Sequence, residues 1–149
     1  LVDVTIDAFI PETYIEDLKL RIEAYRKIAG IMSREDSEDV LDELIDRYGE
    51  PPKSVIGLIE VSLLRNTASH LCISEINQRN GAMYFYIEHP TMPQIYALSA
   101  AYKGRITFNS LSKPYIAIKI SPKTRPFDMM KEVIAIMHDN RNEEETTPI

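Results

Sequence analysis

A chain of 149 residues, of which 44% are hydrophobic and 27% charged, has the size and composition of one globular domain with its own core. Its formal net charge of −6 argues against a protein that mainly binds nucleic acid, because such a protein needs a net basic face. The single cysteine, Cys72, cannot form an internal disulfide, and no apolar run is long enough to span a bilayer.

The first ten residues carry apolar side chains at every even position, which predicts a half-buried strand that Pro11 ends. The segment contains acids and no basic stretch, so it does not resemble a secretory signal. It starts in mid-strand without an initiator methionine. We therefore expect a piece of a larger protein, although a processed N-terminus would give the same pattern.

Three helices are expected after Pro11. The first covers about residues 13–32, and its apolar side chains recur at spacings of three and four, which predicts a buried stripe. That stripe consists of Ile15, Leu18, Ile22, Tyr25, Ile28 or Ala29, and Met32.

The second helix is expected to begin after Ser33, an N-cap residue with Asp36 as a weak capping-box partner, and to end at Gly49. Its inward stripe is Val40, Leu41, Leu44, Ile45 and Tyr48. Pro52 fits the first position of the third helix, which runs to about residue 71 and is the most apolar of the three.

The second half of the chain has the character of a small sheet. Residues 73–78 and 82–88 flank Asn80-Gly81, a pair that favours a hairpin turn. Two more strands are expected at residues 105–108 and 115–120, and two more helices at residues 92–102 and 126–138.

Helices that come first and strands that come mostly second indicate an α+β fold. It has an N-terminal strand and a three-helix segment, followed by a small, mostly antiparallel sheet with two further helices. We expect residues 1–140 to form a single domain and the acidic residues 141–149 to form a disordered tail.

No motif in the chain predicts catalysis or a bound cofactor. The glycines are scattered and form no Gly-rich phosphate loop, and no Gly-x-Ser-x-Gly elbow is present. The histidines and Cys72 do not supply four zinc ligands at a workable spacing, so we expect His70 at a helix end and Cys72 in the core. We expect no metal, cofactor or catalysis; an unfamiliar hydrolase is the enzymatic alternative.

Nucleic-acid binding is an alternative that the residues leave open. Basic side chains gather in two groups, and three aromatic side chains could stack bases. The basic groups are Arg21, Arg26, Lys27 and Lys119, Lys123, Arg125, and the aromatic residues are Tyr84, Phe85 and Tyr115. In the more ordinary interpretation, the basic residues lie on solvated faces and the aromatic residues lie in the core. The negative net charge favours this interpretation.

The second helix carries an acidic face. On a helix that turns about 100° per residue, four acids share an arc of about 100° opposite the apolar stripe, with Arg47 at its rim. These acids are Asp39, Asp42, Glu43 and Asp46. A solvated face with local ion pairs would explain the pattern equally well. Glu43 and Asp46, however, lie near the C-terminal end, where the helix dipole disfavours negative charge, and this placement favours a docking role.

Several of these residues resemble the C-terminal domain of the bacterial transcription-repair coupling factors (Mfd proteins). The matching segments are residues 6–11, Tyr14-Ile15, residues 25–29, residues 43–49 with Pro52, and residues 71–73. The resemblance extends over about residues 2–140 and is strongest in the first half. Tyr48 stands where the family often has Phe, and Cys72 stands where it often has Gly.

This resemblance implies a regulatory domain without catalysis of its own. The parent of the family is an ATP-driven DNA translocase that binds upstream of stalled RNA polymerase, displaces it and recruits the repair protein UvrA. The C-terminal domain docks on the parent's own UvrB-like module, masks the surface that UvrA needs and restrains the motor. In the family, the carboxylates and the arginine of the Glu-Leu-Ile-Asp-Arg run take part in this docking; here they are Glu43, Asp46 and Arg47.

The resemblance further implies that ATP and Mg are bound by motor domains outside this chain, that the parent contacts duplex DNA, and that the protein works in the bacterial cytoplasm, away from membranes. We expect the chain itself to be monomeric. An accessory nucleic-acid-binding module of the same motor is the second hypothesis, and a small stand-alone enzyme is the third.

Overall fold

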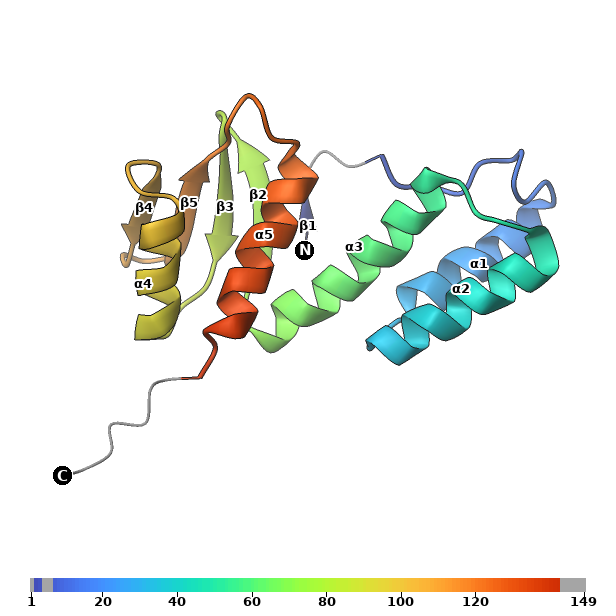
Figure 1. Cartoon of the computed structure of the whole chain (residues 1–149), viewed down its shortest axis with the longest axis horizontal. Coiled ribbons are helices and arrows are strands. Elements are labelled where there is room, and N and C mark those ends of the chain that lie inside the picture. Colours follow the sequence, from blue (N-terminus) through green and yellow to red (C-terminus); the bar gives the residue numbers. More distant parts are fainter. Residues whose placement is uncertain (1, 4–6, 143–149) are drawn as a thin grey trace. The chain divides into compact units, whose positions relative to one another are not determined.

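The computed structural model describes residues 2–3 and 7–142, and the chain divides into two compact units (Figure 1). The described part of the helical unit is residues 7–66, and that of the sheet unit is residues 2–3 and 67–142. The single domain expected for residues 1–140 stays a prediction. Most of the expected tail, residues 143–149, lies outside the described residues.

The N-terminal strand is shorter than its alternation predicts. Strand β1 is Val2–Asp3, residues 4–6 lie outside the described residues, and residues 7–10 are irregular. The reason is contact with helix α3 (Lys53–His70), because the Phe9 N–H donates to the Ser54 carbonyl at 3.2 Å instead of pairing in a sheet. A Cβ atom at Gly57 of α3 would lie 3.3 Å from the Asp7 carbonyl oxygen, so glycine lets this segment pass close to the helix.

Helix α1 is Leu18–Ala29, so it begins later than the apolar pattern predicts. Asp17 sets this start, because its side chain accepts a hydrogen bond from the Leu20 N–H at 3.0 Å. The residues before it form a turn, in which the N–H of Tyr14 donates to the Pro11 carbonyl at 3.0 Å.

Helix α2 (Arg34–Tyr48) begins and ends where the sequence predicts. The Ser33 hydroxyl accepts from the Asp36 N–H at 3.0 Å, and the Asp36 carboxylate accepts from the Met32 N–H at 3.0 Å. Gly49 ends the helix with a φ of 84°, a value that favours glycine.

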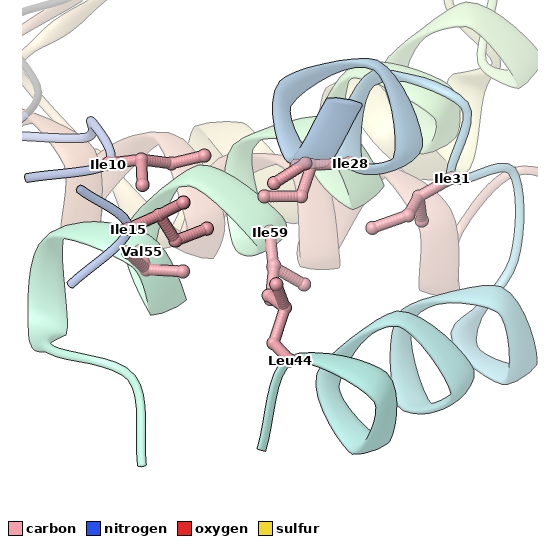
Figure 2. Close-up of a cluster of buried hydrophobic side chains, with 8 residues drawn as sticks. Ile10, Ile15, Ile28, Ile31, Leu44, Val55 and Ile59 are labelled. Carbon is pink, nitrogen blue, oxygen red and sulfur yellow. The ribbon is translucent and has the colours of Figure 1, made fainter. Parts of the chain in front are cut away.

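The core of the helical unit joins the segment before α1 to all three helices (Figure 2). Its buried members are Ile10, Ile15, Ala24, Ile28, Ile31, Leu44, Val55 and Ile59. Half-buried side chains of α2, among them Val40, Leu41 and Tyr48, pack around this cluster, which confirms most of the stripe predicted for the second helix.

The stripe predicted for the first helix is wrong in most of its members. Ile15 and Ile28 are buried, whereas Leu18, Ile22, Tyr25 and Met32 are 61%, 43%, 38% and 67% exposed. The helix instead packs through Ala24 and Ile28, which form a second stripe beside the first. Both stripes have helical spacing, so periodicity alone could not decide which one faces the core.

The sheet unit contains the sheet that the second half of the sequence predicts. The strand order is β1-β2-β3-β5-β4; β1 runs parallel to β2, and the other neighbours are antiparallel. The remaining strands are β2 (Glu75–Arg79), β3 (Ala82–Tyr86), β4 (Ile106–Asn109) and β5 (Tyr115–Lys119). Asn80 and Gly81 have φ values of 52° and 73°, as a tight hairpin turn requires.

Helices α4 (Met92–Ala101) and α5 (Pro126–Asp139) cover one face of this sheet (Figure 1). The strand residues buried at this interface are Ile76, Met83, Phe85, Ile116 and Ile118, and α5 buries Met129, Met130, Val133, Ile134 and Met137. The register pairs Phe85 with Ile116 and Met83 with Ile118. The α+β fold is therefore confirmed.

A buried glutamine joins the two helices of the sheet unit. Gln94 of α4 is 3% exposed, and its amide N–H donates to the Met137 carbonyl of α5 at 2.9 Å. Its side-chain oxygen accepts from the Thr91 N–H at 2.8 Å, which completes a capping box. The sequence analysis did not single out this residue.

Cys72 is exposed, so its predicted place in the core is wrong. Its φ is 62°, and the following N–H, of Ile73, donates to the Ala68 carbonyl at 2.9 Å. The Cys72 N–H donates to the Ser69 carbonyl at 3.0 Å, which completes a Schellman motif at the end of α3. Glycine normally takes this left-handed position, so the helix ends in the usual way although a residue with a side chain occupies it.

Candidate docking surface on helix α2

Helix α2 presents the acidic residues singled out in the sequence on the side away from the core. Asp39, Asp42 and Asp46 are exposed, whereas Leu44 is buried. The Glu43 and Arg47 side chains are 41% and 43% exposed. The structure thus brings all five predicted docking residues together on one helix, and their docking role stays a prediction.

Glu43 already has an internal partner. The Lys27 ammonium of α1 lies 2.5 Å from the Glu43 carboxylate, and the Arg47 guanidinium approaches the same oxygen at 3.8 Å. Glu43 therefore joins α1 to α2, while its oxygens remain partly open to water. Sequence reasoning assigned Lys27 to a solvated basic group, because nothing local in the sequence indicates a partner sixteen residues away.

Aromatic side chains support the C-terminal end of α2. The Arg47 guanidinium lies 5.2 Å from the centre of the Tyr48 ring, and Tyr48 meets Tyr14 edge to face at 5.9 Å. The Tyr14 hydroxyl lies 2.7 Å from the Gly49 carbonyl, to which it donates. Burial raises the pKa of Tyr14, and the nearby Glu50 and Tyr48 add to this effect. The position of Arg47 is therefore set by stacking as well as by charge.

The other three acids have no such contact. Among the described residues, Asp39, Asp42 and Asp46 show neither an ion pair nor a side-chain hydrogen bond. Asp39 also lines an open hollow of about 300 Å³, whose other charged lining residues are Asp36, Glu43 and Lys27. Three carboxylates against one ammonium give this hollow a net negative charge, which suits a basic side chain of a partner.

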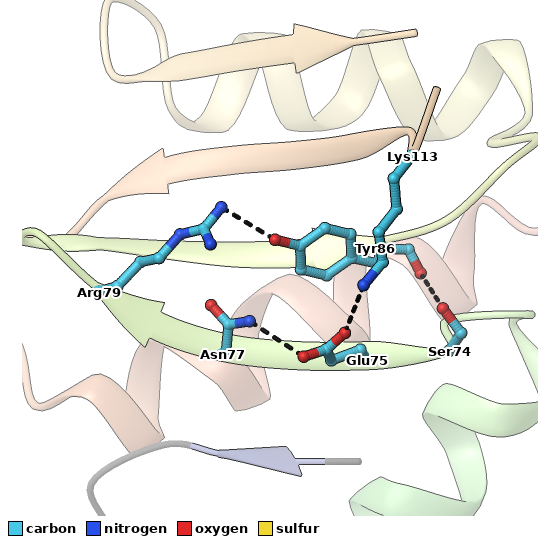
Figure 3. Close-up of polar contacts among 6 residues, drawn as sticks. All are labelled: Ser74, Glu75, Asn77, Arg79, Tyr86 and Lys113. Carbon is cyan, nitrogen blue, oxygen red and sulfur yellow. Dashed lines mark hydrogen bonds and ion pairs between the residues drawn. The ribbon is translucent and has the colours of Figure 1, made fainter. Parts of the chain in front are cut away.

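The sheet unit carries a different polar cluster, on the face opposite α4 and α5 (Figure 3). The Lys113 ammonium lies 2.9 Å from the Glu75 carboxylate and 4.4 Å from the centre of the Tyr86 ring. Arg79 donates to the Tyr86 hydroxyl at 2.9 Å. Hydrogen bonds from Lys113 and Asn77 hold the pKa of Glu75 below its usual range. Glu75 thus neutralises Lys113, whereas Arg79 bonds to a neutral hydroxyl and keeps its charge.

The stacking residues considered for nucleic acid are only partly available. Phe85 is fully buried, as the preferred interpretation of core aromatics predicts, so it cannot stack on a base. Tyr84 and Tyr115 lie on the other face, with ring centres 5.1 Å apart, and the Arg79 guanidinium lies 4.1 Å from the Tyr84 ring centre. Arg21 donates to backbone carbonyls within its own unit.

No metal-binding or membrane-spanning feature is found in the part of the chain that the structure describes. An open hollow of about 450 Å³ beside Cys72 gathers His70, His89, Glu88 and Arg141. Residues 2–3 and 7–142 nevertheless hold no group of three His, Cys, Asp or Glu side chains arranged for a metal ion. Within the same residues, no helix combines the length and apolar character that a bilayer span requires.

Comparison with known sequences gives a consistent result. A family described as TRCF domain matches residues 4–98. The transcription-repair-coupling factor of Bacillus subtilis is 34% identical over 94 residues, which are 63% of this chain and 8% of that protein. The factor of Mycobacterium bovis is 35% identical over 81 residues, which are 54% of this chain and 7% of that protein. The factor of Escherichia coli is 29% identical over 86 residues, which are 56% of this chain and 8% of that protein. The chain thus spans less than a tenth of the length of these relatives.

A solved structure shares the fold. The crystal structure of the C-terminal domain of a transcription-repair coupling factor superposes with a TM-score of 0.78 at 20% identity. The match covers 95% of this chain and 90% of the solved one.

Proposed function

Because this chain belongs to the TRCF domain family, which matches it over residues 4–98, we propose that it regulates a transcription-repair coupling factor by docking on the parent's UvrB-like module through helix α2. The three exposed acids of that helix, Asp39, Asp42 and Asp46, are the observation that carries this proposal. They lie within the segment that the family matches.

The charge distribution on α2 supports a basic docking partner. Asp39, Asp42 and Asp46 have no described internal partner, and three of the four charged residues that line the hollow at Asp39 are acids. Glu43 contributes a carboxylate whose position Lys27 fixes. Arg47, stacked on Tyr48, would contact an acceptor at the rim. A surface of this kind suits a polar interface that forms and dissociates, unlike a buried apolar one.

Modest affinity is sufficient for such docking when both partners belong to one chain. A short flexible connection gives an effective concentration of about 1 mM, so a Kd of about 10 μM would leave the undocked state near 1%. A polar interface with a few ion pairs can supply this affinity. It can also be released when another ligand binds the undocked state more tightly.

In the proposed mechanism the docked domain masks the surface that UvrA needs and restrains the ATP-driven DNA translocase until RNA polymerase is engaged. ATP, Mg and duplex DNA are assigned to other parts of the parent, which works in the bacterial cytoplasm. This chain contributes only the acidic surface and the rigid helical unit that presents it. Purified chain should therefore not hydrolyse ATP, and measurable turnover would contradict the proposal.

Binding of this chain to the purified UvrB-like module tests the docking residues. The double variant Asp42→Asn, Asp46→Asn should weaken binding by about tenfold, because two charges are lost without a large change of shape. Wild-type binding should weaken as salt is raised, since exposed charges are screened.

The matched control is Glu16→Gln, Glu88→Gln, which removes two exposed acids that do not belong to α2. This control should bind the module like the wild type. Equal losses in the two double variants would mean that net charge alone governs binding, and an unchanged affinity in the α2 variant would reject the assignment of these residues.

The accessory nucleic-acid-binding module remains as a second hypothesis. Its support is the exposed sheet face with Tyr84, Tyr115 and Arg79. Lys113 already pairs with Glu75, so this cation is less available for phosphates. A titration of the chain with duplex DNA over a range of salt concentrations separates the two functions. Steep salt dependence together with an affinity above ordinary non-specific binding would favour this second function.

A further inference from the structure

Helix α1 presents an apolar stripe to solvent, here called the α1 seam: Leu18, Ile22, Tyr25 and Ala29. All four side chains are exposed, with Leu18 at 61% and Ile22 at 43%. Single exposed apolar residues are normal on a surface, but a contiguous row marks an interaction site more often than chance.

The seam is not needed for the core of its own unit. Helix α1 packs inward through Ala24 and Ile28, which are 5% and 1% exposed. The Tyr25 hydroxyl accepts the Ile10 N–H at 2.8 Å, so this ring is fixed in place while its surface remains partly open. The seam is therefore a preformed feature of a folded helix.

The spacing of the seam identifies the shape of its partner. Its members follow one another at intervals of four, three and four residues, which is the a/d pattern of a helix that pairs with another helix. On a helical wheel with about 100° per residue they fall within about 60°, a narrow line rather than a broad face. A second helix laid along α1 fits this line.

The charges beside the seam identify the chemistry of the partner. Lys19 and Arg26 are exposed, lie two helical turns apart and border the seam on its open side, at the positions that flank an a/d pattern. Arg21 borders the other side, but its side chain is 14% exposed and is held by the Ile15 and Glu16 carbonyls at 3.0 and 3.2 Å and by the Glu12 carboxylate at 3.8 Å. The open border of the seam is thus basic, although the chain has a net charge of −6.

We propose that the α1 seam is a second docking site, which takes an acidic amphipathic helix of another protein. Apolar side chains of the incoming helix would cover Leu18, Ile22 and Tyr25, while its acids would lie beside Lys19 and Arg26. This site differs from the acidic surface of α2, which requires a partner of opposite charge. The two sites can therefore be tested independently.

Two other occupants fit the seam less well. A second copy of the chain, pairing seam to seam, would bring Lys19 and Arg26 against the same residues of the other copy, which is a like-charge contact. An anionic membrane suits a helix with a broad apolar face, whereas this seam is narrow. The exposed acids of α2, the helix packed beside α1, would also be repelled by such a membrane.

A pair of designed peptides tests the proposal. Both are helices of three heptads with Leu at a and d; one carries Glu at e and g, and the other carries Lys there. Fluorescence anisotropy with the whole 149-residue chain should show binding of the Glu peptide at least tenfold tighter than binding of the Lys peptide. Equal affinity for the two, or no binding of either, would overturn the proposal.

Two variants and one control locate the contact. Leu18→Ser, Ile22→Ser should reduce binding of the Glu peptide by about tenfold or more, because two apolar contacts are lost. Lys19→Glu, Arg26→Glu should reverse the preference in favour of the Lys peptide. The control Leu111→Ser changes an apolar residue of the sheet unit that is 76% exposed, and it should bind like the wild type.

The remaining measurements address the other occupants. Circular dichroism should show all variants folded, as expected for substitutions of exposed side chains. Dimerisation in analytical ultracentrifugation that Leu18→Ser, Ile22→Ser abolishes would assign the seam to a second copy. Co-sedimentation with phosphatidylserine vesicles that the same variant abolishes would assign it to a lipid surface. Either result would overturn the proposal of an acidic helix.

Discussion

The ion pair between Lys27 of α1 and Glu43 of α2 can be measured by a double-mutant cycle. The variants are Lys27→Met, Glu43→Gln and the combination, which remove each charge with little change of side-chain length. The cycle isolates the coupling between the two groups because their separate effects cancel. The coupling energy thus shows how much the Glu43 carboxylate contributes to the stability of the helical unit through its contact with Lys27.

The exposure of the two side chains determines the coupling energy that we expect for this ion pair. The two side chains are 44% and 41% exposed, so water screens the 2.5 Å contact, and exposed pairs of this kind contribute about 0.2–1 kcal/mol. The same Glu43 oxygen lies 3.8 Å from Arg47 in an i,i+4 arrangement, which adds about 0.3–0.5 kcal/mol. We expect a Lys27–Glu43 coupling of about 0.5–1 kcal/mol and a total cost of about 1 kcal/mol for Glu43→Gln.

Urea denaturation followed by far-ultraviolet circular dichroism gives the four free energies of unfolding. The coupling should fall by about half or more in 1 M salt, where the screening length is about 3 Å. An unchanged slope of the unfolding free energy against urea concentration would show that unfolding exposes a comparable surface area in all four proteins. A coupling within error of zero at low salt would refute the assignment of Glu43 as a link between α1 and α2.

Three further outcomes follow from local geometry. Cys72→Gly should stabilise the chain by about 0.5–1 kcal/mol in urea denaturation, because glycine tolerates a φ of 62°, whereas Cys72→Ala should give no gain. Gln94→Ala should cost about 1–3 kcal/mol of unfolding free energy, since it leaves the buried Met137 carbonyl without its donor. Lys113→Met should raise the pKa of Glu75 toward its usual value in a carboxyl NMR titration. Because the wild-type pKa is lowered, the stabilising contribution of Glu75 is present above the unfolded-state pKa and is lost as pH falls through the folded-state pKa. The pH dependence of stability should therefore be weaker in Lys113→Met.

Features encoded by a few adjacent residues could be predicted from the sequence. Ser33 caps α2, Gly49 ends it, and Asn80-Gly81 forms the hairpin turn, because each depends on local backbone geometry. The α+β class followed from the order of these elements. The acidic side of α2 followed from helical geometry alone, since Leu44 had to face the core.

Features that depend on tertiary contacts could not be predicted in this way. The sequence offers two apolar stripes on α1, and only the packing of Ala24 and Ile28 decides between them. The Lys27–Glu43 contact joins two helices, so helical spacing gives no sign of it. Cys72 was expected inside because free cysteines are often buried, but the end of α3 turns it outward.

Each unit contains closely spaced tyrosine rings whose near-ultraviolet circular dichroism reports on its packing. The chain has no tryptophan, so tyrosine dominates its near-ultraviolet spectrum. In the sheet unit, Tyr115 lies 5.1 Å from Tyr84 and 5.7 Å from Tyr86 between ring centres, and in the helical unit Tyr14 lies 5.9 Å from Tyr48. Rings this close and held at fixed angles give circular dichroism that disappears when their packing is lost. Tyr115→Phe and Tyr14→Phe each remove one of these signals, so the melting of either unit can be followed without a label.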